Sequence, residues 1–223
     1  MEFVFYNLRD FTSDRHRNVD DYPYGGGCGM VMMPGPIKKA LDHVAGLSAG
    51  DGKRRLSIYF TPQGRLLKQE TVEELAKYDE LVLFCGHYED IDFRARKLFD
   101  AEYSVGDYVL SGGEPAALTV IDAVTRKMPG ALGNPDSSME DSFSKSSALF
   151  DCPHYTRPPV WEGKYVPEVL INGDHKKIEV YRKARALINT MRVRPDLMKP
   201  EDLCPEDLKL IREYFRNYHC YEE

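Results

Sequence analysis

A short, wholly apolar run, Leu81–Cys85, constrains the fold of this chain more than any other feature. A strand-length run without alternating polar residues suggests burial on both faces, which is typical of a parallel sheet covered by helices. Further strands are predicted at 2–6, 56–60 and 103–110, and helices at 36–44, 72–78 and 114–127. Strands that alternate with helices along the chain predict an α/β domain with a parallel sheet.

Three loops are expected at one edge of this sheet, because each follows a predicted strand. They comprise residues 61–64, 86–89 and 106–113. Ligands of open parallel sheets bind beyond the carboxyl ends of the strands. The prolines and glycines of these loops suit contacts between a ligand and backbone amides or carbonyls, although ordinary loop glycines are the alternative on composition alone. The glycine-rich run 25–29 lacks the GxGxxG spacing of a dinucleotide site.

The second half of the chain has a different composition. Residues 133–148 are rich in Ser, Asp and Asn and poor in apolar residues, which is typical of a linker or a mobile loop. Beyond them, one amphipathic helix is predicted between the cap Asp174 and Arg194–Pro195, and another from Pro205. Their apolar stripes are Ile178, Tyr181, Ala184, Ile188 and Met191 in the first helix, and Leu208, Ile211, Tyr214 and Phe215 in the second. We therefore expect a domain at 1–132, a linker at 133–149 and a helical domain at 150–223.

Charge is distributed unevenly. The net charge is −6, yet residues 175–199 contain eight Lys or Arg (Lys176, Lys177, Arg182, Lys183, Arg185, Arg192, Arg194 and Lys199) against Glu179 and Asp196. A local excess of one sign can bind phosphates even when the whole chain is acidic. We favour a nucleic-acid partner over the alternative of a solvated helix face.

Several classes of protein are excluded by pattern. No apolar run approaches the length of a spanning helix, and the first residues do not resemble a secretory signal. The five cysteines form no CxxC pair and the six histidines show no HxxxH spacing. We expect free thiols, no metal held by the protein, and a cytoplasmic location.

Three polar residues have both a functional and an ordinary interpretation. Asp141, in the polar segment, is either a solvated or capping carboxylate or a general base. Arg126, at the end of the helix 114–127, either complements the helix dipole or holds a substrate oxygen. Arg157, between prolines, contacts phosphate or pairs with a nearby acid.

Seven short strings, taken together and in order along the chain, are more specific for a protein family than any single residue. They are Asn7–Thr12, Val19–Gly27, Thr61–Gly64, Val105–Glu114, Glu140–Phe143, His154–Pro158 and Arg194–Leu197. Together they closely resemble the bacterial tRNA (guanine-N1)-methyltransferase family, TrmD. The resemblance implies a SPOUT-type fold, a parallel sheet with a deep C-terminal trefoil knot, followed by a small all-α C-terminal domain. Such a knot is a rare exception to unknotted chains.

The resemblance also implies a cofactor, S-adenosylmethionine, bound in a bent shape by the three loops. Matched by position, the cofactor residues are Tyr59, Phe60, Thr61, Pro62, Gln63, Gly64, Gly86, Glu89, Val105, Gly106, Asp107, Tyr108, Val109, Leu110, Gly112 and Gly113. The family is an obligate homodimer whose active site lies at the subunit interface, and its linker folds over the substrate when RNA is bound.

The implied reaction methylates N1 of the guanosine 3′ of the anticodon (position 37) in tRNA and releases S-adenosylhomocysteine. Asp141 matches the proposed general base, and Arg126 the arginine that stabilises charge developing on O6. The residues expected to bind tRNA are Arg157, Lys176, Lys177, Arg182, Lys183 and Arg185. Mg²⁺ is expected to act through the substrates, since no carboxylate cage is evident. Neither a membrane nor DNA is expected as a partner.

Three departures from the family pattern stand out. The chain begins after one strand and one helix of the family, so we expect a misassigned start or a truncation, and a less stable protein than a longer form. The family's Gly-Arg-Tyr-Glu-Gly reads Gly86-His87-Tyr88-Glu89-Asp90 here. Asp90 is expected to alter cofactor affinity, although Asp tolerates left-handed backbone. Pro115 is expected to be harmless at the start of its helix.

Two other functions are consistent with parts of this pattern. One is a SPOUT methyltransferase with another RNA target, which the linker carboxylate and the basic C-terminal segment disfavour. The other is an RNA-binding protein that has lost catalysis. The departure at the N-terminus favours it, and the presence of Asp141 and Arg126 counts against it.

Overall fold

The computed structural model describes residues 1–47, 50–131, 141–143, 150–198 and 203–217. The chain divides into two compact units, Met1–Ala131 and Leu132–Glu223. Of the predicted linker, only Asp141–Phe143 lies within the described residues.

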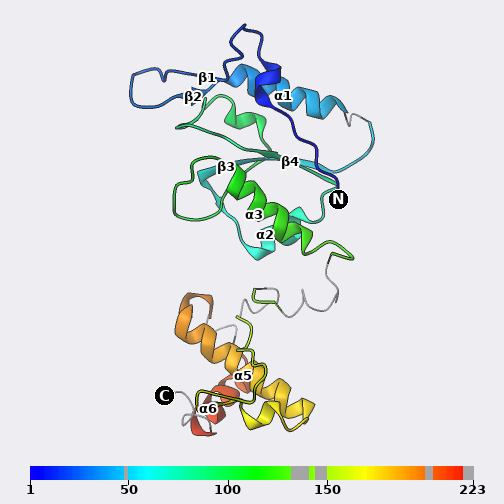
Figure 1. Ribbon diagram of the computed structural model, residues 1–223, viewed down its shortest axis with the longest axis vertical. Coiled ribbons are helices and arrows are strands. Elements are labelled where there is room, and N and C mark those ends of the chain that lie inside the picture. The colour runs from blue at the N-terminus through cyan, green and yellow to red at the C-terminus, as the bar shows by residue number, and fades with distance from the viewer. Residues whose placement is uncertain (48–49, 132–140, 144–149, 199–202, 218–223) are drawn as a thin grey trace. The chain divides into compact units, whose positions relative to one another are not determined.

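The first unit is built on a three-stranded parallel sheet (Figure 1). Its strands are β3 (Arg55–Leu66), β4 (Glu80–Phe84) and β6 (Ala101–Ser104), in the order β4-β3-β6. Ile58 of β3 lies opposite Leu83 on one side and Ala101 on the other. The predicted α/β class with a parallel sheet is therefore confirmed. The predicted burial of the apolar run on both faces is wrong, because every residue of β4 is only half-buried. Within the described residues β4 pairs with β3 alone, so it is an edge strand.

Strand β3 passes through the predicted turn at 61–64 instead of ending there. Phe60 and Arg65 both lie opposite Tyr103 of β6, so the residues between them form an irregularity within the ladder. A Cβ atom at Gly64 would lie 2.6 Å from the Tyr103 backbone nitrogen. Glycine therefore allows β3 to pass close to β6 at this point.

Helices cover both faces of this sheet. They are α1 (Pro34–Leu47), α2 (Gln69–Leu75) and α3 (Glu114–Thr125), close to the predicted helices. Figure 1 shows α2 and α3 on one face and α1 on the other. Ile58, Leu75 and Val120 form the centre of the first layer, and each is at most 1% exposed. Full burial of side chains of this size contributes about 1.5–3 kcal/mol each. Ile37 of α1 packs on the opposite face with Tyr59.

Short strands complete the first unit. β1 (Asp20–Asp21) is antiparallel to β2 (Val31–Met32), and β2 is parallel to β5 (Asp90–Ile91). The predicted strand at 2–6 is wrong: the segment is exposed, with Phe5 89% exposed, and within the described residues it has no ladder partner. The strand predicted at 103–110 is also too long, because β6 ends at Ser104.

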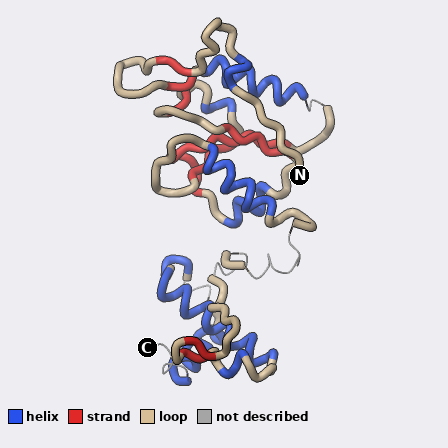
Figure 2. The backbone as a smooth tube through the Cα atoms, viewed as in Figure 1, coloured by secondary structure: helices blue, strands red, loops and turns tan. Residues whose placement is uncertain are grey.

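The second unit is mostly helical. Asp174 caps α5 (His175–Val193) by accepting a hydrogen bond from the Lys177 amide at 3.2 Å, as predicted. α5 stops before Pro195, and α6 (Pro205–Asn217) begins at the predicted residue. The expectation of an all-α domain is wrong, because β7 (Val160–Trp161) and β8 (Lys164–Tyr165) form an antiparallel hairpin (Figure 2).

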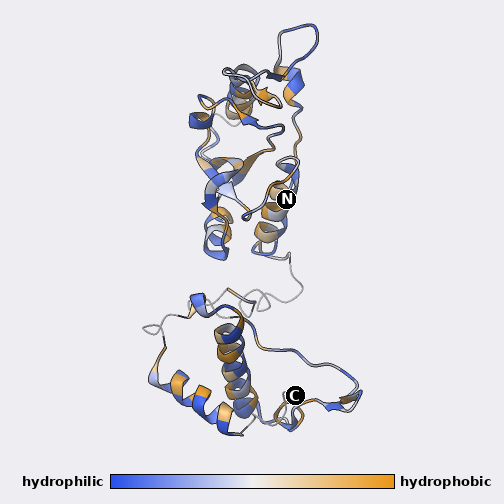
Figure 3. Ribbon diagram, turned by 90° about the vertical axis from the view of Figure 1, so that its left-hand side faces the viewer, coloured by the Kyte–Doolittle hydropathy of each residue, from blue (hydrophilic) through white to orange (hydrophobic). Residues whose placement is uncertain are grey.

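The two long helices pack through part of the predicted stripes. Tyr181, Ala184 and Ile188 of α5 form a core with Tyr214 of α6. Figure 3 shows apolar and polar residues alternating along both helices. Five stripe residues are not part of this core. Ile178 and Ile211 are half-buried, and Met191, Leu208 and Phe215 are each at least 40% exposed. The packed face of α6 is instead formed by Asp207, Leu210 and Tyr214, whose spacing follows the helical period.

None of the described helices is both long and apolar enough to span a membrane. The four cysteines within the described part, Cys28, Cys85, Cys152 and Cys204, are free thiols. The described residues contain no group of three or more potential metal ligands.

Candidate functional site

A cleft lies at the carboxyl ends of the parallel strands, where the three predicted loops meet. It is lined by Tyr59, Phe60, Thr61, Pro62, Gly86, His87, Tyr88, Glu89, Asp90, Tyr103, Ser104, Val105, Gly106, Tyr108, Val109, Leu110, Ser111, Gly112, Gly113 and Ala116. The three segments are distant in sequence and come together because the carboxyl ends of parallel strands share one edge. Every predicted cofactor residue except Gln63, Gly64 and Asp107 is among these lining residues.

Backbone contacts fasten two of the loops to each other. The Gly113 amide donates to the Gly86 carbonyl at 2.9 Å, and His87 forms an isolated bridge with Gly112. A Cβ atom at Gly113 would lie 2.7 Å from the Cys85 Cα atom, closer than real Cβ contacts allow. The approach of these two backbones therefore requires glycine at position 113.

A side-chain contact between His87 and Glu114 also connects the loop at 86–89 to the start of α3. His87 Nε2 lies 2.7 Å from Glu114 Oε1, and both side chains are about half exposed. Glu114 stands in the first turn of α3, where the helix dipole favours a carboxylate. Burial, with the nearby negative charge of Glu114, raises the pKa of the Cys85 thiol to about 11.

The third loop is held by short-range hydrogen bonds. Ser104 Oγ donates to the Gly106 carbonyl at 3.1 Å and accepts from the Gly106 amide at 3.2 Å. The Tyr108 hydroxyl donates to the Val105 carbonyl at 3.1 Å. These bonds turn the chain immediately after β6, which explains why the strand is shorter than predicted.

The floor of the cleft contains a tyrosine–carboxylate pair. The Tyr59 hydroxyl donates to Asp90 Oδ1 at 2.6 Å, and the Ile91 amide donates to the same oxygen at 2.7 Å. Burial raises the pKa of Tyr59, and the hydrogen bond to Asp90 raises it further. Asp90 lies in β5 rather than in left-handed backbone; the left-handed residue of this loop is Tyr88, with φ of 64°.

The charge of the lining restricts the ligand. Glu89 and Asp90 are acidic, and the described lining contains no lysine or arginine. Such a site lacks the lysines and arginines that commonly bind phosphate. Four tyrosines, Tyr59, Tyr88, Tyr103 and Tyr108, add aromatic surface that favours a flat ring or a cation. This acidic and aromatic lining fits S-adenosylmethionine, which has an adenine ring and a cationic sulfonium.

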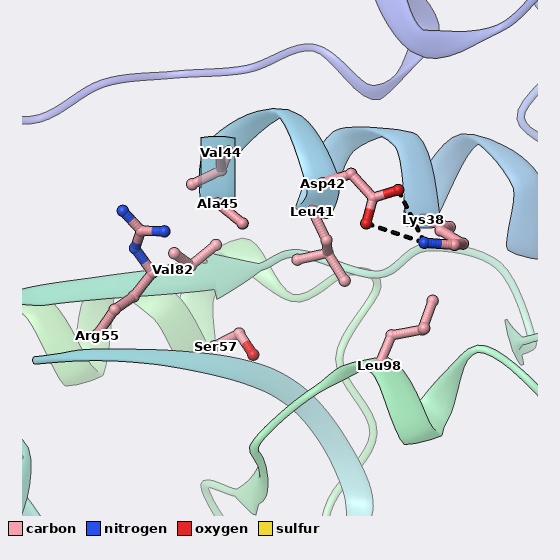
Figure 4. A pocket seen from close by; sticks show the side chains of 9 residues that line it. All are labelled: Lys38, Leu41, Asp42, Val44, Ala45, Arg55, Ser57, Val82 and Leu98. Carbon is pink, nitrogen blue, oxygen red and sulfur yellow. Dashed lines mark hydrogen bonds and ion pairs between the residues drawn. The ribbon is translucent and has the colours of Figure 1, made fainter. Parts of the chain in front are cut away.

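A second cavity lies between α1 and the first residues of β3 (Figure 4). Its charged groups pair with one another or with nearby residues: Lys38 contacts Asp42 at 2.8 Å and Arg55 contacts Glu80 at 3.0 Å. Ser57 donates to Asp100 at 2.6 Å. This cavity is at the opposite end of the strands from the carboxyl edge, and its polar groups serve the packing of the unit.

Comparisons with known proteins agree with the geometry of the cleft. The family model described as tRNA (Guanine-1)-methyltransferase TrmD matches residues 1–200. The chain belongs to this family. Among its relatives, the tRNA (guanine-N(1)-)-methyltransferase of Caldanaerobacter subterraneus is 48% identical over 208 residues, covering 93% of this chain and 83% of the relative. That of Pectobacterium carotovorum is 48% identical over 220 residues, covering 98% and 86%.

Three residues that the family pattern assigns to the cofactor lie outside the cleft lining. The side chain of Gln63 accepts a hydrogen bond from Arg96 at 2.7 Å. Gly64 is positioned by the close approach of β3 to β6. Asp107 follows Gly106 but is not among the lining residues.

Other lining residues were not assigned to the cofactor, although the loops at 86–89 and 106–113, which contain some of them, were expected at this edge. They are His87, Tyr88, Asp90, Tyr103, Ser104, Ser111 and Ala116. His87 and Tyr88 lie between two predicted residues, Gly86 and Glu89. Their position in that loop could have indicated that they line the cleft. Tyr103 and Ser104 belong to the end of β6, where the strand boundary was misplaced.

Neither of the two residues with predicted catalytic roles is among the residues that line this cleft. Arg126 caps the C-terminus of α3, as predicted, while Gly113 of the cleft caps its N-terminus. Asp141 belongs to the second unit and is half-buried. Its neighbours are fixed there: Ser142 Oγ accepts from the Asp151 amide at 2.9 Å, and the Phe143 ring lies 5.5 Å from that of Phe150. Glu140 lies outside the described residues.

The predicted tRNA-binding residues divide into two groups. Lys183 contacts Asp207 at 2.6 Å, and the Arg185 guanidinium lies over the Tyr214 ring at 5.2 Å, so both residues join α5 to α6. Arg157, Lys176, Lys177 and Arg182 are exposed. Lys177 also contacts Asp174 at 3.4 Å.

Proposed function

We propose that this protein transfers the methyl group of S-adenosylmethionine to N1 of the guanosine 3′ of the anticodon in tRNA. The observation that carries the proposal is the glycine-lined, acidic and aromatic cleft at the carboxyl edge of the sheet. It occurs in a chain whose curated relatives, about 48% identical over nearly its whole length, are tRNA (guanine-N(1)-)-methyltransferases.

We propose that the cofactor lies in this cleft, where it supplies a methyl group activated by the sulfonium. The loops at 61–64, 86–89 and 106–113 then correspond to the trefoil knot of SPOUT proteins. Backbone amides and carbonyls of these loops hold the adenine, so no charged side chain is needed for that part. Mg²⁺ is proposed to act through the substrates.

Asp141 is proposed as the general base. N1 of guanine carries a proton, and a carboxylate can accept it as the methyl group is transferred. The anchoring of Ser142 and Phe143 to residues 150 and 151 supports this role, because it fixes the neighbouring backbone to the helical unit. A base carried by the RNA-binding unit would approach the cleft together with the RNA.

Arg126 is proposed to stabilise the negative charge that develops on O6. α3 has 12 residues, so its two ends are about 18 Å apart at 1.5 Å per residue. Arg126 is thus far along the helix from the cleft of its own chain. This separation supports a homodimer in which Arg126 completes the site of a second copy.

The domain at 150–223 is proposed to bind tRNA through the exposed residues Arg157, Lys176, Lys177 and Arg182. These cations can neutralise phosphates, whereas Lys183 and Arg185 are engaged with α6. A location in the cytoplasm follows from this substrate.

The decisive experiment measures transfer of labelled methyl from S-adenosylmethionine to two unmodified tRNA transcripts. One has guanosine 3′ of the anticodon and the other has adenosine there, and the nucleoside product is identified by mass. We expect 1-methylguanosine from the first transcript only. No product from a folded protein that binds the cofactor would favour the RNA-binding alternative, and methylation elsewhere would show another RNA target.

The assignment of the base is tested by Asp141→Asn. We expect turnover to fall by at least about 100-fold, the usual contribution of general base catalysis, with cofactor affinity unchanged. Glu162→Gln, in the exposed β7–β8 hairpin, removes an acid of the same unit and serves as control. Wild-type turnover in Asp141→Asn would show that Asp141 is not the base.

A further inference from the structure

Asp90 is one of two cleft residues, with His87, at which this chain departs from the family pattern. It stands where that pattern has glycine, and it lines the cleft beside Glu89. Two donors, the Tyr59 hydroxyl and the Ile91 amide, bind one of its oxygens, Oδ1. Hydrogen bonds from two donors hold the carboxylate in one orientation.

The surrounding charges leave the influence of Asp90 largely uncancelled. Arg96 interacts electrostatically with Asp90, but it also donates to Glu102 Oε1 at 2.9 Å and to Gln63 at 2.7 Å. Its charge is therefore matched by that of Glu102. Glu89 adds a second negative charge to the lining, and neither lysine nor arginine is found among the described lining residues.

We infer that Asp90 is a specificity-determining residue that makes the cleft prefer the cationic sulfonium cofactor over its neutral thioether product. The inference rests on the proposed function. Substrate and product share adenosine and the amino-acid group, and differ in the methyl group and the positive charge on sulfur. A fixed carboxylate favours the charged form by Coulomb attraction, and it has no corresponding attraction for a neutral sulfur. The consequence is reduced product inhibition.

The expected size follows from Coulomb's law. For any two unit charges on the order of 10 Å apart, at an effective dielectric of about 20 to 40, Coulomb's law gives a change in affinity of about 5- to 20-fold. The ratio of the two dissociation constants should change by this factor when the charge of Asp90 is removed.

The test uses isothermal titration calorimetry on the full chain with three ligands: S-adenosylmethionine, S-adenosylhomocysteine, and sinefungin, which carries an amine in place of the sulfonium. Asp90→Asn keeps the shape and an oxygen acceptor for Tyr59, so it should fold. We expect weaker binding of both cationic ligands by about 5- to 20-fold, with the product affinity within about twofold of wild type. Asp42→Asn removes an acid of the same unit that lines the second cavity, away from the proposed cofactor loops, and is the matched control.

The outcomes separate the inference from the proposed function. If Asp90→Asn weakens all three ligands by the same factor, or none, Asp90 does not discriminate by charge and the inference is overturned. If Asp42→Asn reproduces the change in ratio, the effect comes from the net charge of the protein and not from Asp90. If the wild-type protein binds none of the three ligands, the proposed cofactor itself is wrong.

Discussion

The close approach of two cleft backbones at Gly113 yields the sharpest test of the site. In Gly113→Ala the new Cβ atom would lie 2.7 Å from the Cys85 Cα atom, 2.9 Å from the Gly86 nitrogen and 3.1 Å from the Cys85 carbonyl carbon. All three are backbone atoms, so no side chain can rotate away to make room. The loop that contains Gly86 must move away from the start of α3.

The cost can be estimated from two contributions. Overpacking by one methyl group costs about 1–3 kcal/mol, and loss of the hydrogen bond from the Gly113 amide to the Gly86 carbonyl costs about 1 kcal/mol more. A destabilisation of about 2–4 kcal/mol lowers the Tm of a domain of this size by roughly 8–15 °C. Because both backbones line the cleft, we expect the affinity for S-adenosylmethionine to fall by at least about tenfold, equivalent to about 1.4 kcal/mol.

The assay combines thermal unfolding with calorimetric titration of the cofactor. Gly46→Ala is the control, since Gly46 lies in α1 with no atom within 4 Å of its Cβ position. That substitution should leave cofactor affinity unchanged and stabilise the protein by up to about 1 kcal/mol, because alanine favours helix. Wild-type melting and wild-type affinity in Gly113→Ala would refute the close-packed arrangement of the two loops.

Three further predictions concern other parts of the molecule. Charge reversal of Lys176 and Arg182 should weaken tRNA binding and flatten its dependence on salt, measured by filter binding at several salt concentrations; an unchanged slope would place the RNA elsewhere. Lys183→Ala should lower the unfolding free energy of the helical unit by about 1–2 kcal/mol in chemical denaturation, because Asp207 then loses its contact with the lysine ammonium. Unchanged stability would contradict this packing role. Between pH 9 and 11 the thiol of Cys85 ionises in the unfolded chain but not in the folded one. The free energy of unfolding of the wild type should therefore fall relative to that of Cys85→Ala as the pH rises. A difference between the two proteins that does not change with pH would contradict the burial of this thiol.

Local signals in the sequence located the helices well. Asp174, Pro195 and Pro205 mark helix ends through capping and the missing proline amide, which act within one turn of the chain. The meeting of the three cleft loops was predictable for a topological reason, because parallel strands bring their carboxyl ends to one edge. Backbone contacts such as that between Gly86 and Gly113 could not be located in advance, since they depend on the relative positions of distant segments.

The strand prediction at 2–6 was wrong because a strand needs a neighbouring strand to which it can hydrogen-bond. Phe3 and Phe5 have strand-forming side chains, but within the described chain no neighbouring strand pairs with them, and both are exposed. The hairpin β7–β8 was missed although it has a recognisable turn. Glu162 and Gly163 have φ of 48° and 77°, and two consecutive positive φ values are the mark of a type I′ turn. The Glu-Gly pair between Trp161 and Lys164 was the available signal.

The basic segment shows why a count of charges overstates a binding surface. Each lysine or arginine between 175 and 199 contributes equally to the sequence argument, yet packing assigns them different tasks. Lys183 compensates the mostly buried Asp207, and Arg185 lies over Tyr214, so a ligand phosphate would have to compete with contacts that hold α5 to α6. Lys176 and Arg182 are exposed and not engaged in that packing. The affinity of the helical unit for RNA should therefore follow these two residues, while substitutions at Lys183 and Arg185 should act first on stability.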